Sequence, residues 1–128
     1  MFIRFVINEK DEDSGRRQGL FQVMKELEDG NHLHVYELDL YKEIYQWFRL
    51  NLKTPNSFSR SSRPHAKKIA LSWFKASAHE HIRKMYEVVG IIEAHGIHVM
   101  VIRSSRPGYV VYEDEFQVAA EAFQSTGA

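Results

Sequence analysis

The sequence contains no cysteine and no apolar run that approaches membrane length. Without thiols the chain can form no disulfide, no thiolate metal site and no cysteine nucleophile. A membrane-spanning helix needs about 20 consecutive apolar residues. Residues 2–7 are followed at once by acidic residues, which is too short and wrongly flanked for a signal peptide. We therefore expect a cytoplasmic protein without a membrane partner.

The chain also has no net charge, because 17 basic residues balance 17 acidic ones. Proteins dedicated to coating DNA are usually basic, so nucleic acid is a disfavoured partner. The charges are nevertheless segregated: residues 51–110 hold ten basic and three acidic side chains. This segregation predicts one positive zone on the surface. The alternative is that the acidic ends of the chain neutralise it, within the monomer or a dimer.

The common catalytic and cofactor motifs are missing as well. There is no nucleophile elbow, no phosphate-binding loop and no dinucleotide fingerprint. His32 and His34 would share one face of a strand, whereas His79 and His81 would point about 200° apart on a helix. None of these pairs has a third ligand at a recognised metal spacing. We expect neither a metal nor a cofactor.

Apolar spacing predicts the elements along the chain. We expect a strand over residues 2–7, a solvated loop over 8–15 and a helix that opens at Arg16 and ends at residues 29–31. Residues 32–37 are ambiguous, with a short strand as one option. A second helix is expected from Asp39, a good N-cap residue, to about residue 52. A long apolar stripe then predicts helices over 64–75 and 78–95, broken near Ser77.

After Gly96 the spacing of apolar residues changes from that of a helix to that of a strand. Glycine itself suits the end of a helix. Residues 97–102 are nearly all apolar and predict a central strand buried on both faces. The short turn at residues 103–108 predicts a β-hairpin with a partner strand at 109–112. A last short strand is expected at 116–118. The prediction is an α+β fold of two layers, with three or four mostly antiparallel strands and three or four helices on one face. Residues 1–120 would form a single domain, followed by a frayed tail at 121–128.

The helix from Asp39 carries an unusually broad aromatic face. Such a face is most often part of a core, and the alternative is a subunit interface, where Tyr and Trp are enriched. The residues concerned are Leu40, Tyr41, Ile44, Tyr45, Trp47, Phe48 and Leu52.

The most unusual feature is a five-residue repeat, Arg-Ser-Ser-Arg-Pro, at residues 60–64 and again at 103–107. Both copies fall where loops are expected, and their arginines are Arg60, Arg63, Arg103 and Arg106. Guanidinium forks with serine hydroxyls and free amides suit phosphate or carboxylate binding. If the fold brings the loops together, four arginines would face one anion. The alternative is that these are ordinary loop residues that match by chance.

These features lead to three functional hypotheses. The first is a non-enzymatic binding or regulatory module that captures an anionic small molecule or an acidic protein through the arginine loops, as a homodimer. The second is a small enzyme for a phosphorylated or carboxylated substrate, with His98, Glu113 or Glu115 as acid or base. The third is nucleic-acid binding, with Phe58 or Tyr109 stacking on bases.

Overall fold

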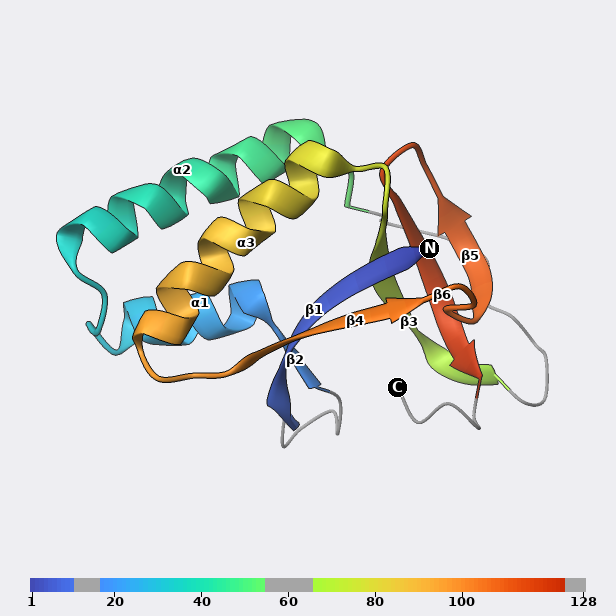
Figure 1. The fold of residues 1–128 in the computed structure, drawn as a ribbon, viewed down its shortest axis with the longest axis horizontal. Helices are drawn as coiled ribbons and strands as arrows, with labels where there is room; N and C mark the ends of the chain where they lie inside the picture. The colour runs from blue at the N-terminus through green and yellow to red at the C-terminus, as the bar shows by residue number, and fades with distance from the viewer. Residues whose placement is uncertain (11–16, 55–65, 124–128) are drawn as a thin grey trace. The chain divides into compact units, whose positions relative to one another are not determined.

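A computed structural model describes residues 1–10, 17–54 and 66–123 of the 128-residue chain. Within these ranges it has three helices and six strands, so the predicted α+β class is confirmed and the expected strand count is too low (Figure 1). In chain order the elements are β1 (Phe2–Lys10), β2 (Arg17–Gly19), α1 (Leu20–Asp29), α2 (Val35–Asn51), β3 (Ala66–Lys75), α3 (His79–Ala94), β4 (Val99–Ser104), β5 (Tyr109–Glu113) and β6 (Gln117–Phe123).

The strands hydrogen-bond in the order β2-β1-β3-β6-β5, and β4 pairs with β1. The pairs β1–β2, β1–β3, β3–β6 and β5–β6 are antiparallel. Contacts divide the chain into two compact units. Unit 1 comprises Met1–Arg4, Thr54–Ile82 and Ile102–Ala128, and unit 2 comprises Phe5–Lys53 and Arg83–Val101.

Unit 1 is organised around β6, which lies between β3 and β5. All residues of β6 before Phe123 are buried, so both faces of this strand are covered. Its register places Ala120 opposite Leu71 and Val118 opposite Trp73, and both of these β3 residues are buried. A run of small side chains in β6 therefore packs beside the larger side chains of β3.

Unit 2 contains the main helical core. Each helix turns one apolar stripe inward, at the spacing of three and four residues that brings side chains to one face. The buried residues are Leu20, Val23 and Met24 of α1, Tyr41, Ile44 and Phe48 of α2, Met85, Val88, Ile91 and Ile92 of α3, and Phe5, Val6 and Ile7 of β1. The core interpretation of the aromatic face is thus confirmed for Tyr41 and Phe48, while Tyr45 is 46% exposed.

The helix predicted over residues 64–75 is wrong, because Ala66–Lys75 is the strand β3. Leu71 and Trp73 are buried while Ser72 between them is exposed, which is the alternation of a strand. The break near Ser77 is confirmed as a turn, and α3 matches the second predicted helix closely. Gly96, with φ +79°, follows its end as predicted.

The predicted hairpin is also wrong. β4 pairs with β1, and β5 pairs with β6. Only Val99 of β4 is buried, so this strand is not buried on both faces as predicted, whereas β6 is. β6 also runs to Phe123, which places Glu121 inside a strand, whereas the tail was expected to start there. Residues 124–128 of that tail lie outside the described residues.

The starts of the first two helices differ from the prediction. Residues 17–19 form β2 instead of a first helical turn, and α1 begins at Leu20. Its end is as predicted: Asn31, with φ 61°, follows Gly30, and the His32 amide donates to the Leu27 carbonyl. α2 begins at Val35 with His34 as N-cap, so Asp39 is not the cap and residues 32–37 form no strand.

Candidate functional site

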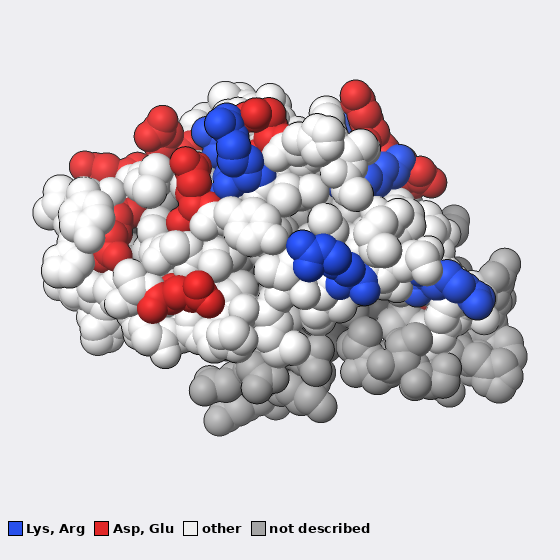
Figure 2. All heavy atoms as spheres, in the orientation of Figure 1, with Lys and Arg blue, Asp and Glu red and all other residues white. Residues whose placement is uncertain are grey.

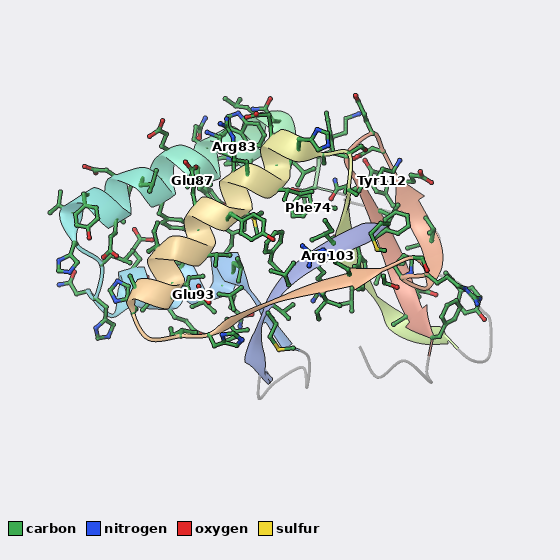
Figure 3. The ribbon with its side chains drawn as sticks, viewed as in Figure 1. Phe74, Arg83, Glu87, Glu93, Arg103 and Tyr112 are labelled. Carbon is green, nitrogen blue, oxygen red and sulfur yellow. The ribbon has the colours of Figure 1, made fainter. Side chains whose placement is uncertain are left out.

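The second arginine loop, residues 103–108, lies in unit 1. Arg103 is exposed on β4 (Figure 3). Arg106 is exposed in the loop that follows. Arg60 and Arg63 of the first loop lie outside the described residues. The convergence of four arginines on one anion therefore stays a prediction, and the site is described from Arg103 and Arg106.

The backbone of this loop is tied closely to its surroundings. The Ser104 hydroxyl accepts a hydrogen bond from the Arg106 amide at 3.0 Å, and Pro107 is buried. Gly108 has φ +139°, and a Cβ at this position would lie 2.2 Å from the Glu121 carbonyl oxygen. At Gly108 the chain therefore lies against the backbone of β6, with no space for a side chain. This close approach determines the position of the Arg106 backbone two residues earlier.

The guanidinium of Arg106 lies over an aromatic ring. Its Cζ atom is 5.3 Å from the centroid of Phe123, and the ring of Tyr109 meets Phe123 edge to face at 4.7 Å. A cation over a ring face is attracted by the ring quadrupole. This contact favours one position of the exposed Arg106 side chain, so less side-chain entropy is lost when it binds an anion.

The two units also differ in their content of charged residues. By sequence, unit 1 contains eight basic and five acidic residues, whereas unit 2 contains nine basic and twelve acidic ones. Acidic side chains gather over α2 and α3 on the face drawn in Figure 2. By sequence, unit 1 therefore has a net charge of +3 (8 − 5) and unit 2 a net charge of −3 (9 − 12).

The predicted acid–base candidates lie in different units, His98 in unit 2 and Glu113 and Glu115 in unit 1. β4, which follows His98, pairs with β1, and β5, which ends at Glu113, pairs with β6. His98 is exposed, and its Nδ1 atom lies 3.7 Å from Glu93, which is in the last turn of α3 (Figure 3). Glu113 forms an ion pair with Lys75 at 2.6 Å, and Glu115 is exposed.

The best-defined ionisable pair was missed by sequence reasoning. It joins Glu37, in the first turn of α2, to His95, just after α3. The His95 Nε2 atom lies 3.0 and 3.1 Å from the two carboxylate oxygens of Glu37, and the His34 amide also donates to Glu37 at 2.9 Å. The Glu37 side chain is 4% exposed and the His95 side chain 18%. The spacing of His34 and Glu37 could have indicated the helix start, but nothing in the sequence pairs Glu37 with His95.

The environment lowers the pKa of Glu37 below its ordinary value of 4.5. Burial acts to raise the pKa, but the hydrogen bonds from His34 and His95 and the nearby positive charge together outweigh it. Both helix ends favour these groups, since a carboxylate suits a helix N-terminus and an imidazolium a C-terminus.

We expect the Glu37–His95 pair to make the free energy of unfolding depend on pH in the acidic range. A lowered folded pKa adds stability above pH 4.5, and this contribution is lost as the pH falls through the folded value. Glu37→Gln should therefore reduce the free energy of unfolding at pH 7 by about 1–3 kcal/mol, and by less at pH 3. Urea titrations at both pH values measure this. Glu43→Gln on the exposed face of α2 is the control, and equal losses at both pH values for Glu37→Gln would contradict the prediction.

In residues 1–10, 17–54 and 66–123, no group of three or more His, Cys, Asp or Glu side chains is placed to hold a metal ion. None of the helices in these ranges is both long and apolar enough to cross a membrane. Comparison of the chain with protein families, curated proteins and solved structures finds no match.

Proposed function

We propose that the protein is a binding module that captures an anionic group, a phosphate or a carboxylate, at the loop of residues 103–108. The observation that carries the proposal is the exposed Arg106 guanidinium, which is held over Phe123 and emerges from a backbone tied to β6. A guanidinium offers a planar fork of donors that matches both kinds of anion. The ligand is a small anionic molecule or an acidic protein segment.

Thermal unfolding in the presence of inorganic phosphate, sulfate and citrate tests the proposal. A ligand at 100 times its dissociation constant adds about 2.7 kcal/mol to the stability of the folded state, which raises the melting temperature. We expect this shift in the wild type, a smaller one in Arg106→Lys, which keeps the charge but not the fork, and none in Arg106→Ala. Arg49→Ala on α2 should respond like the wild type. An undiminished shift in Arg106→Ala would refute the proposal.

The contribution of the first loop is tested by the same measurement. If residues 60–64 and 103–107 form one site, Arg63→Ala should weaken the shift about as much as Arg106→Ala. If Arg63→Ala responds like the wild type, only the second loop binds. The enzyme hypothesis, with these arginines as clamps and His98, Glu113 or Glu115 as acid or base, has no geometric support beyond the loop itself, so the binding module is preferred.

A further inference from the structure

The Glu37–His95 pair belongs to unit 2, whereas the arginine loop belongs to unit 1. We propose that Glu37 and His95 form a carboxylate–imidazole dyad in which Nδ1 of His95 attacks small activated acyl compounds, such as phenyl esters. His95 is the catalytic residue of this dyad and Glu37 its positioning residue.

The hydrogen bonds determine which tautomer His95 adopts. Glu37 has a lowered pKa and is ionised near neutral pH, so both of its oxygens only accept hydrogen bonds. The Nε2 atom lies within 3.1 Å of both oxygens and must therefore carry the proton that it donates. In the neutral ring the lone pair is then on Nδ1. Among the described residues Nδ1 has no hydrogen-bond partner, so the lone pair is not committed to another contact there.

The carboxylate is itself held in place, which is what an orienting group requires. The His34 amide donates to one Glu37 oxygen, and the carboxylate is almost fully buried at the start of α2. The ring of His34 lies 6.4 Å from that of His95 and is stacked on Tyr36, which is 71% exposed. The aromatic ring of His34 near His95 suits a flat substrate such as a phenyl ester better than a bulky polar one.

The reaction balances without any other reagent. Nδ1 of His95 forms a bond to the acyl carbon, and the bond from that carbon to the phenolic oxygen breaks, so the phenolate leaves with the electron pair. The acyl-imidazole now carries a positive charge beside the Glu37 carboxylate, which stabilises it. Water then adds to the acyl carbon and gives one proton to solvent, the bond to Nδ1 breaks with its electron pair returning to the nitrogen, and the product leaves as the carboxylic acid. The neutral Nε2–H imidazole is restored.

Hydrolysis of p-nitrophenyl acetate at pH 8, where an ordinary imidazole is neutral, tests the catalytic role. We expect His95→Gln, whose amide can still donate to Glu37, to lose the histidine-dependent rate by roughly tenfold or more. The matched control His79→Gln, at an exposed histidine of α3, should keep the wild-type rate. Melting curves identify any variant that fails to fold. Equal rates in the wild type and His95→Gln would overturn the proposal.

Acylation by diethyl pyrocarbonate, followed residue by residue by mass spectrometry, separates the dyad from a purely structural pair. His95 is 18% exposed and His98 77%, so accessibility alone predicts that His98 reacts faster. The dyad predicts the reverse order in the wild type and a slower reaction of His95 in Glu37→Gln. Faster modification of His98 in the wild type would overturn the proposal. Neither experiment involves anion binding, so a negative result for the dyad would not contradict anion binding at the arginine loop. A negative result for anion binding would likewise not contradict the dyad.

Discussion

Replacing Gly108 with alanine is expected to lower the free energy of unfolding by about 3 kcal/mol. Two causes act together. The φ of +139° is one that a residue with a side chain rarely adopts. The new Cβ would also lie 2.2 Å from the carbonyl oxygen of Glu121 and 2.9 Å from Cα of Ala122, which are backbone atoms of β6 that cannot turn aside.

Two other glycines provide graded controls for this substitution. Gly96 has φ +79° but nothing within 4 Å of its Cβ position, so Gly96→Ala should cost only about 1 kcal/mol. Gly90 lies inside α3 with open space around it, so Gly90→Ala should stabilise the fold by about 0.5–1 kcal/mol. Urea unfolding of the three variants measures the series. A cost for Gly108→Ala no greater than that for Gly96→Ala would contradict the close approach of the loop to β6.

Replacing Asp114 with alanine is expected to cost about 2–3 kcal/mol, because its carboxylate accepts four hydrogen bonds at the turn between β5 and β6. The donors are the Tyr112 hydroxyl, the Phe116 amide, and the amide and side chain of Gln117. Gln117 is 4% exposed, so alanine would leave buried donors without an acceptor.

The pH dependence of this loss in unfolding free energy shows whether the charge of the Asp114 carboxylate, and not only its polarity, stabilises the turn. Burial acts to raise the pKa of Asp114, but its hydrogen bonds outweigh burial and the pKa lies below 3.8. The stability it adds is present above pH 3.8 and disappears as the pH falls through the folded value. Urea titrations should therefore show a larger loss for Asp114→Ala at pH 7 than at pH 2. Glu115→Ala, at an exposed neighbouring carboxylate, should cost little at either pH.

The local patterns predicted those elements that depend on neighbouring residues. The strand at residues 2–7, the end of α1, the turn at Ser77 and the whole of α3 followed from periodicity and from turn or capping residues. The error at β3 arose because Ile69 and Trp73 are four residues apart, a spacing that fits a helix face and a strand face equally well. Residues 66–75 form a strand because they pair with β6, which lies some fifty residues later in the sequence.

Contacts between distant residues could not be read from the sequence. The hairpin expected at residues 103–108 does not form, because β5 pairs with β6 and β4 pairs with β1. Glu37 and His95 are 58 positions apart, and no local pattern in the sequence connects them. The second arginine loop was found because its five residues repeat, but the support of Arg106 by Phe123 depends on the course of β6.

The division into two units has a consequence for how the chain is made. Unit 1 draws on the first four residues and on the last strands, while most of unit 2 lies between them in sequence. β3 therefore leaves the ribosome long before β6, its principal neighbour, has been translated. During that interval the buried faces of Leu71 and Trp73 lack their native cover, so nascent chains that stall before residue 117 should be those most exposed to aggregation and to chaperones.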